Sequence, residues 1–393
     1  MVISGLSQLK RSDFDILKGK RLAVMANHTA TDESGEVLWS ILMERGLNVS
    51  FLLAVEHGLW AVEQDMVPVE TSVDDLTGLP ILSLYGTTED SLNPDIEALS
   101  RVDAVVFDIQ DVGSRYYTYQ ASLQRLLRAL NGTGVEAIVL DRPNPLGGEI
   151  VEGNMVQEEF FSFVGQVPFP NRHGLTMGEM ANYFIALEHL DVELTVVALA
   201  DWSREAYWQM VFPLWVPPSP NMPTPMTALV YPGGCFLEGT NLSEGRGTTT
   251  PFQLLGAPWM KNPGLIVEKM QVYQDMGVIL RPCKFLPAFQ KWKDEVCEGV
   301  FVHVHSRLLF QPVRYYLMLI KAIRDLYPSE FKFRKETYEF VSDRLPFDLL
   351  AGGSEIRNWL EEGSFESGEQ FLEEQFSQFE DEFLLTRADY LRY

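Results

Sequence analysis

In the first half of this chain, short runs of β-branched and aliphatic residues alternate with longer helix-like stretches, and no other feature restricts the fold as much. The apolar runs occupy residues 20–26, 49–55, 103–109, 136–140 and 194–199. Two intervening stretches, residues 37–45 and 120–130, are followed by Gly46 and Gly132, which can end a helix in the left-handed conformation. The pattern predicts an α/β fold in which helices cover both faces of a parallel sheet.

The length of the chain predicts two lobes, because a single hydrophobic core stops growing near ~250 residues and this chain has 393. A proline-dense stretch, residues 216–225 (VPPSPNMPTP), cannot continue a helix or a central strand. It is either the crossing between the lobes or a rigid loop at the cleft between them. We place the boundary there, with an N-terminal catalytic domain over residues 1–220 and a smaller C-terminal domain over residues 221–393.

The pattern changes beyond the prolines. Residues 299–306 alternate between apolar and polar side chains as a strand does, and Pro312 begins an amphipathic stretch that predicts a helix to about Tyr327. The acidic and aromatic tail, residues 367–393, has the spacing of a surface helix that packs one face. We therefore expect a mixed α+β fold in the C-terminal lobe.

The charge and the missing motifs exclude several classes of function. A formal net charge of -24 disfavours a nucleic-acid or anionic-membrane partner, since both need a positive field. No apolar run approaches the ~20 residues of a membrane helix. The phosphate-binding patterns G-x-G-x-x-G and G-x-x-x-x-G-K-[ST] do not occur, nor does the serine-hydrolase pattern G-x-S-x-G. We expect no nucleotide cofactor and no nucleophilic serine.

We also expect neither a disulfide framework nor a metal centre. The three cysteines, Cys235, Cys283 and Cys297, lack the paired spacing of a zinc site. His303 and His305 share a face of a predicted strand, but no third ligand is evident near them in the sequence. The N-terminal segment has no long apolar region followed by a small-residue cleavage pattern, so a cytoplasmic location is expected.

Polar side chains follow four of the predicted strands, and the carboxyl ends of parallel strands are where such sheets bind ligands. These residues are Asn27 and His28 after the first strand, Glu56 and His57 after the second, Asp108, Gln110 and Asp111 after the third, and Asp141, Arg142 and Asn144 after the fourth. Any one of them could instead cap a helix or a turn. As a group, with Gly58 and Gly113 nearby, they favour a ligand site.

Carboxylates, amides, arginines and aromatics together are the residue types that a glycosidase uses. One carboxyl must stay protonated to donate to the leaving oxygen, and a second anionic group acts as nucleophile, base or stabiliser. Glu56 suits the acid, because it follows the apolar strand VSFLLAV and so lies at the edge of low-dielectric surroundings. His57 is expected to point to the opposite side, since successive side chains of a strand alternate.

A second group of polar residues and glycines occupies residues 238–250 (EGTNLSEGRGTTT). It contains Asn241, Glu244 and Arg246, and apolar runs flank it on both sides. The segment is either a surface turn or a loop that folds over a sugar. The flanking apolar runs hold both of its ends in the core, which favours the second interpretation.

Long blocks of sequence, in order along the chain, resemble one known family. They are AVMANHTA, VEHG, TGLPILSLYG, VVFDIQDVGSRYYTY, VLDRPNPLGG, FPNRHGLTMGE, WVPPSPNMPT, ALVYPGGCFLEGTNLSEGRGTTTPFQLLGAPW and PVR. The family is that of the NamZ-type exo-β-N-acetylmuramidases, glycoside hydrolase family 171, and the resemblance covers about residues 5–393. It implies a Rossmann-like N-terminal lobe, a smaller C-terminal lobe and an active-site cleft between them. It also implies release of N-acetylmuramic acid from the non-reducing end of peptidoglycan fragments.

The resemblance implies site residues as well. The family's proposed catalytic glutamate lies in its EHG block, which here makes it Glu56. The lactyl carboxylate of N-acetylmuramic acid favours arginine, whose planar group binds a carboxylate through two hydrogen bonds. The arginines of the matching blocks are Arg115, Arg142, Arg172 and Arg246, each of which could instead hold a loop carboxylate. The other candidates in these blocks are Tyr116, Tyr117, His173, Asn221 and Asn241, of which the tyrosines could instead pack in the core.

The second catalytic group stays open. It is Asp108, Asp111 or Glu244, or else the acetamido oxygen of the substrate itself. Two other functions are also compatible with the residues. A Rossmann-like enzyme acting on a nucleotide or sugar nucleotide predicts an absorbing ligand in the ultraviolet spectrum, and a non-catalytic wall-sugar binding protein predicts binding without hydrolysis. The sequence gives no oligomeric state.

Overall fold

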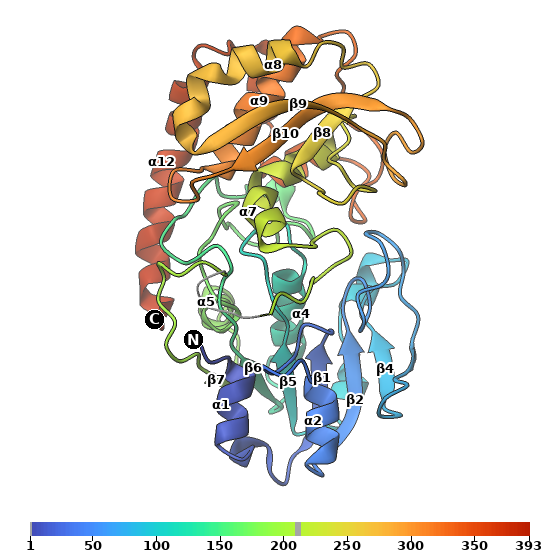
Figure 1. Ribbon diagram of the computed structural model, residues 1–393. Helices are drawn as coiled ribbons and strands as arrows, with labels where there is room; N and C mark the ends of the chain where they lie inside the picture. Colours follow the sequence, from blue (N-terminus) through green and yellow to red (C-terminus); the bar gives the residue numbers. More distant parts are fainter. Residues whose placement is uncertain (1, 209–213) are drawn as a thin grey trace.

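The computed structural model describes residues 2–208 and 214–393, and its two lobes lie one above the other in Figure 1. The lower, N-terminal lobe contains a seven-stranded sheet with the order β3-β4-β2-β1-β5-β6-β7. Its strands are β1 Arg21–Ala26, β2 Asn48–Ala54, β3 Ser72–Val73, β4 Pro80–Ser83, β5 Ala104–Asp108, β6 Glu136–Leu140 and β7 Leu194–Val197. Neighbouring strands are parallel except for β3, which is antiparallel to β4. The predicted α/β fold with a parallel sheet is confirmed.

The five strands expected from the sequence are all present, with ends that differ by two residues at most. β3 and β4 were not expected. β4 is four residues long and begins with Pro80, and proline is tolerated at the first residue of a strand near a sheet edge but suggests a loop when only the sequence is read.

Helices cover both faces of this sheet, as predicted. α1 (Gly5–Arg11) and α2 (Leu38–Glu44) pack on one face, and α4 (Tyr119–Leu130) and α5 (Met177–Glu188) pack on the other. Alternate residues of β1 divide between the two cores: Leu22 and Val24 face α1 and α2, while Ala23 and Met25 face α4 and α5. The short helix α3 (Ile96–Leu99) precedes β5.

The C-terminal lobe is a mixed α+β unit, as expected. Its antiparallel sheet has the order β8-β10-β9, and it lies above the larger sheet in Figure 1. The elements are α7 Pro225–Gly234, β8 Leu254–Ala257, α8 Gly264–Lys269, β9 Val278–Phe285, β10 Cys297–Val304, α9 Pro312–Leu326, α10 Pro346–Ala351, α11 Glu355–Glu362 and α12 Gly368–Arg387. β10 and α9 confirm the strand and the helix predicted there, and the division of the chain at residue 220 stays a proposal.

The last helix returns from the upper lobe to the lower one, along one side of the molecule (Figure 1). α12 buries Leu372, Phe376 and Phe383 and exposes most of its acidic residues, so the predicted one-faced surface helix is confirmed. Near its end Arg387 donates to the carbonyl of His173, with 2.9 Å between nitrogen and oxygen. α12 therefore ties the two lobes together on the side away from the loops of β2 and β4.

None of the helices within residues 2–208 and 214–393 is long and apolar enough to cross a lipid bilayer. The three cysteines are free thiols, and Cys235 and Cys297 are buried. In the same described parts of the chain, no group of three histidine, cysteine, aspartate or glutamate side chains is arranged to hold a metal ion.

A buried carboxyl at the junction of the lobes gives a first testable prediction. Glu152 is 2% exposed, and its Oε1 accepts the backbone N–H of Arg314 in the first turn of α9 at 2.8 Å. Burial raises the pKa of Glu152 to about 7. The folded state thus holds a proton that the unfolded chain releases near pH 4.5, so stability falls as the pH rises from there to about 7.

Glu152→Gln keeps the acceptor and removes the ionisation. We expect this variant to be more stable than the parent above pH 7, by up to about 3 kcal/mol, and nearly equal to it at pH 4.5. Urea unfolding at both pH values measures the difference, and Glu149→Gln, on an exposed side chain three residues earlier, is the control. An equal gain at both pH values would contradict the explanation.

Candidate active site

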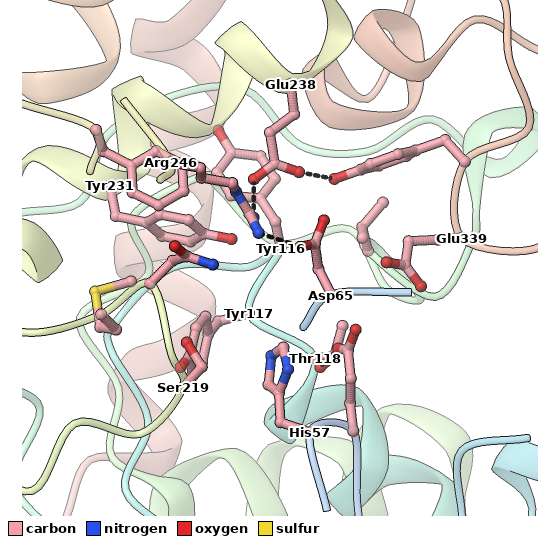
Figure 2. A pocket seen from close by; sticks show the side chains of 16 residues that line it. His57, Asp65, Tyr116, Tyr117, Thr118, Ser219, Tyr231, Glu238, Arg246 and Glu339 are labelled. Carbon is pink, nitrogen blue, oxygen red and sulfur yellow. Dashed lines mark hydrogen bonds and ion pairs between the residues drawn. The ribbon is translucent and has the colours of Figure 1, made fainter. Parts of the chain in front are cut away.

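A pocket of about 40 Å³ lies where the two lobes meet, and Figure 2 shows the side chains that converge on it. The N-terminal lobe contributes Glu56, His57, Asp65, Tyr116, Tyr117, Thr118 and Val164; the segment between the lobes contributes Ser219, Asn221 and Met222; and the C-terminal lobe contributes Tyr231, Glu238, Arg246, Phe252, Tyr338 and Glu339. Part of the proline-dense stretch therefore forms a wall of the pocket. The pocket lies beyond the carboxyl end of β2, as expected for a ligand site of an open parallel sheet.

Glu56 follows β2 by two residues and is 4% exposed. Its Oε2 accepts a hydrogen bond from the hydroxyl of Thr118 at 2.6 Å, and its Oε1 lies 3.5 Å from the backbone nitrogen of Met66. Within the described part of the chain, Glu56 forms no ion pair. Its carboxyl group is therefore held in position by neutral donors and is not neutralised by a cation.

His57 lines the same pocket as Glu56, which differs from the expected alternation. The strand ends at Ala54, and His57 has a φ of 69°, so the backbone turns and brings both side chains to one side. The Nδ1 atom of His57 lies 2.9 Å from the carbonyl oxygen of Glu63. In the neutral ring this contact requires the proton on Nδ1, which leaves Nε2 as an acceptor.

Arg246 is the single arginine or lysine among the described residues that line the pocket, and carboxylates surround it. It is paired with Asp65 from the opposite lobe and with Glu238, whose Oε1 lies 2.7 Å from Nη2. The Oε1 atom of Glu244 is 3.4 Å from its Nε. Tyr338 donates to the other oxygen of Glu238 at 2.7 Å. Figure 2 shows the contacts of Arg246 with Asp65 and Glu238 in the upper part of the pocket.

Glu339 and Tyr85 form another polar contact across the lobes at this site. The hydroxyl of Tyr85, two residues after β4, donates to Oε2 of Glu339 at 3.0 Å. Glu339 is 5% exposed. Burial and the neighbouring charge of Glu56 raise the pKa of Glu339 well above its ordinary value.

An aromatic wall closes the remaining side. The rings of Tyr116 and Tyr117 meet Tyr231 edge to face, with centroids 6.2 and 5.7 Å apart. The hydroxyl of Tyr116 donates to the carbonyl of Pro232 at 2.8 Å. Both tyrosines are buried. They line the pocket and also pack against the C-terminal lobe.

Two family models cover nearly the whole chain. The N-terminal model of the exo-β-N-acetylmuramidase NamZ matches residues 22–226, and the C-terminal model matches residues 229–393. The chain belongs to the NamZ family. A curated relative, the peptidoglycan β-N-acetylmuramidase NamZ of Bacillus subtilis (strain 168), is 40% identical over 349 residues, which are 88% of this chain and 81% of that protein.

Two solved structures have the same fold as this chain. Two DUF1343 family proteins from Bacteroides fragilis NCTC 9343 superpose on the whole chain and on 99% of their own lengths, with TM-scores of 0.87 and 0.78 at 30% and 29% identity. The resemblance noted in the sequence is thereby confirmed, together with the division into a parallel-sheet lobe and a smaller α+β lobe.

The pocket of this NamZ family member contains only part of the predicted set of site residues. Those that line it are Glu56, His57, Tyr116, Tyr117, Asn221 and Arg246. Those that lie outside it are Asn27, His28, Asp108, Gln110, Asp111, Arg115, Asp141, Arg142, Asn144, Arg172, His173, Asn241 and Glu244. Each residue outside the pocket has contacts that account for its position.

The three candidates for a second carboxylate lie outside the pocket, contrary to expectation. Asp108 is fully buried in an ion pair with Arg142, whose Nη2 lies 3.1 Å from Oδ2. Asp111 accepts the backbone N–H of Gly113 at 2.6 Å and so holds a turn. Glu244 is paired with Lys291, at 2.8 Å, behind Arg246.

Several polar residues after the strands satisfy nearby backbone groups, which was the alternative interpretation of each. Asn27 accepts the N–H of Thr29 at 3.0 Å, and Asn144 donates to the carbonyl of Leu175 at 3.0 Å. Asp141 accepts the N–H of Gly178 at 2.8 Å in the first turn of α5. These contacts arrange the loops around the site.

The same holds for Gln110 and two of the arginines. Gln110 donates to the carbonyl of Pro143 at 2.9 Å. Arg115 is fully buried and donates to backbone carbonyls from both lobes, including that of Leu350 at 2.7 Å. Arg172 donates to the carbonyl of Leu146 at 2.7 Å. Arg115 thus links the two lobes, whereas these contacts of Gln110 and Arg172 lie within the N-terminal lobe, and none of the three residues lines the pocket.

The remaining residues outside the pocket are held in the same way. Nδ1 of His173 accepts the N–H of Leu175 at 3.1 Å. Asn241 donates to the carbonyl of Glu330 at 2.8 Å, in a contact within the C-terminal lobe. Burial lowers the pKa of His28, which contacts the backbone of Pro217 in the proline-dense stretch.

Sequence reasoning missed several polar residues of the pocket and its surroundings. They are Asp65, Tyr85, Thr118, Ser219, Tyr231, Glu238, Tyr338 and Glu339. Five of them lie within the blocks that had been noticed, so those blocks were the available signal: Tyr85, Thr118, Ser219, Tyr231 and Glu238. Asp65, Tyr338 and Glu339 lie outside the blocks, and only the packing of the two lobes brings them to the pocket.

Proposed function

We propose that this chain is an exo-acting glycoside hydrolase that releases N-acetylmuramic acid from the non-reducing end of peptidoglycan fragments. The observation that carries the proposal is the position of Glu56, the glutamate of the family's EHG block, in a pocket that both lobes close. Glu56 has no cationic partner among the described residues and is held by the donors Thr118 and Met66. An enclosed pocket suits one terminal sugar better than a long chain passing through, which supports exo action.

The lactyl carboxylate of the sugar has one candidate partner in this pocket. Arg246 is the only one of the four predicted arginines that lines it. In this structure the carboxylate of Asp65 forms an ion pair with one side of the guanidinium group of Arg246. Asp65 lies on a loop between β2 and β3, so a substrate carboxylate can take its place when this loop moves. We propose that Arg246 recognises the lactyl group in this way.

The volume of the pocket supports such a movement. Ligand pockets measure roughly 300–1,000 Å³, whereas this one measures about 40 Å³. A sugar ring therefore enters only when contacts across the lobes open. The contacts that have to separate are those of Asp65 with Arg246 and of Tyr85 with Glu339.

The acidity of the pocket argues against the nucleotide alternative. Four carboxyl groups, those of Glu56, Asp65, Glu238 and Glu339, line it together with one guanidinium group. Phosphate groups need cations or converging backbone N–H groups, and this lining offers a negative field instead. Hydroxyl and amide groups of a sugar, in contrast, donate readily to carboxylates.

Incubating the purified protein with a chromogenic N-acetylmuraminide and with the matching N-acetylglucosaminide tests the function. We expect release of the chromophore from the muraminide and little or none from the glucosaminide. On peptidoglycan fragments we expect free N-acetylmuramic acid as the first product, with the remaining chain shortened by one sugar. Binding without hydrolysis would contradict the proposal and favour a wall-sugar binding protein.

A further inference from the structure

A second cavity adjoins the pocket and shares one carboxyl side chain with it. This outer cavity has a volume of about 480 Å³ and lies between Met66, Tyr85 and the following loop of the N-terminal lobe and Thr337 and Phe340 of the C-terminal lobe. Among the described residues, only Glu339 lines both the pocket and the outer cavity. Glu339 therefore lies between the small pocket and the larger outer cavity.

The backbone at Glu339 has a conformation that its sequence does not favour. The N–H and carbonyl groups of Tyr338 and Val341 pair with each other at 2.9 Å, which leaves Glu339 and Phe340 as the two residues of a tight hairpin turn. Both have positive φ, 45° and 69°. Such turns prefer Asn-Gly, and positive φ is unfavourable at other residues because of steric crowding. Strain of this kind is frequent at functional sites, and here it positions a carboxyl group between two cavities.

Packing against the opposite lobe holds the turn in place. The ring of Phe340 meets Tyr85 edge to face with centroids 5.6 Å apart, and it also meets Phe163 at 6.4 Å. The hydroxyl of Tyr85 donates to Oε2 of Glu339 at 3.0 Å. The orientation of the carboxyl group is therefore set by contacts from both lobes.

Glu339 and Glu56 line the same pocket. Glu56 accepts from Thr118 and Met66, and Glu339 accepts from Tyr85. Burial and the neighbouring charge of Glu56 raise the pKa of Glu339 well above its ordinary value, because a second negative charge in a buried site is unfavourable. The surroundings of Glu339 therefore favour its protonated form, which can donate.

We propose that Glu339 is the general acid of the reaction, placed between a terminal-sugar subsite in the pocket and a leaving-saccharide subsite in the outer cavity. This inference rests on the proposed function. Glu339 gives its proton to the glycosidic oxygen, which also takes the electron pair of the breaking bond to the anomeric carbon. A water molecule then supplies the hydroxyl group to that carbon, and its other proton returns the carboxyl pair to the singly protonated state.

The outer cavity has the chemistry of a saccharide site. Hydroxyl groups of Thr87, Thr88 and Thr337 line it, and they can exchange hydrogen bonds with sugar hydroxyls. The rings of Tyr85 and Phe340 also line it and offer apolar surface. Its volume falls within the roughly 300–1,000 Å³ typical of ligand pockets.

The test compares two leaving groups on Glu339→Gln. A general acid is needed when the leaving group is a saccharide and is dispensable when it is an activated phenol, which departs without protonation. We expect this variant to lose about 10²–10⁴-fold in kcat/KM on a disaccharide with N-acetylmuramic acid at its non-reducing end. On a dinitrophenyl N-acetylmuraminide we expect a loss within about tenfold.

Two further variants keep the test interpretable. Glu336→Gln changes an exposed residue of the same segment and should retain both activities. Glu339→Asn suits a positive φ better than glutamate does, so we expect a folded protein with equal or higher melting temperature and the same loss on the disaccharide. An equal loss on both substrates, or no loss on the disaccharide, would overturn the inference, whereas a parent protein inactive on both muraminides would overturn the proposed function.

Discussion

Glu56→Gln should abolish turnover of an aryl N-acetylmuraminide while leaving the fold intact. Glu56 is a buried carboxyl group of the pocket that forms no ion pair within the described residues, so no cation holds its oxygens away from a reacting sugar. Removing a positioned acid or base costs about 10²–10⁴-fold, and removing a nucleophile costs more. The kcat of the purified variant on the aryl substrate measures the effect.

Stability should change little in this variant, because the single oxygen of glutamine can still accept from Thr118 at the 2.6 Å position, and the contact that is lost, with the backbone nitrogen of Met66, is long at 3.5 Å. Thermal unfolding checks this expectation. Glu70→Gln, on an exposed side chain of the loop that follows Glu56, is the matched control and should match the parent in both measurements. Near-normal turnover in Glu56→Gln would remove Glu56 from the mechanism.

Arg246→Leu should have the largest effect on stability. Arg246 is 7% exposed and neutralises Glu238 and Asp65, with Glu244 also 3.4 Å away. Removing one partner of a buried ion pair typically costs about 3–5 kcal/mol, because the other charge stays buried without compensation. Urea unfolding measures the loss, and adding Glu238→Gln to the same chain should restore part of it.

The control for this loss is Arg101→Leu. Arg101 pairs with Glu97 on the surface, where an ion pair contributes about 0–1 kcal/mol.

Among variants that remain folded, Arg246→Lys keeps the charge but loses the paired hydrogen bonds, so we expect a weaker preference for the muraminide over the glucosaminide. An unchanged preference would exclude Arg246 as the lactyl partner. In the unfolding experiment, a loss of stability in Arg246→Leu no larger than that in Arg101→Leu would exclude the structural role of Arg246.

The strands and their order along the chain could be predicted because they depend on local patterns. The apolar runs at β1, β2, β5 and β6 contribute to the cores on both faces of the sheet, so each run is continuous and easily recognised. The run at β7 is half-buried but equally continuous. β4 escaped recognition because it is short, begins with proline and is only partly buried. The pattern also gave Glu56 its place at the carboxyl end of β2, where the pocket lies.

The same pattern could not distinguish Glu56 from Asp108, since both are acidic residues at the end of a buried strand. Asp108 is the last residue of β5, and Arg142 follows the end of β6. These two strands are adjacent in the sheet, so the two side chains meet and their charges neutralise each other. Glu56 lies toward the opposite lobe and meets hydroxyl and amide donors. Which partner each acid meets depends on the sheet order and on the lobe packing, and neither can be read from spacing along the chain.

The sequence by itself determined the parallel sheet and the second lobe, and the resemblance to the family indicated Glu56 as a candidate, because periodicity and long ordered blocks are local properties of the chain. Only the tertiary structure decided which charged groups meet at the site. Asp65, Tyr85, Arg246 and Glu339 come from loops far apart in sequence, and the distances between them follow from how one lobe closes on the other. The proton that we assign to Glu339 has the same origin, since burial and the charge of Glu56 arise only after folding.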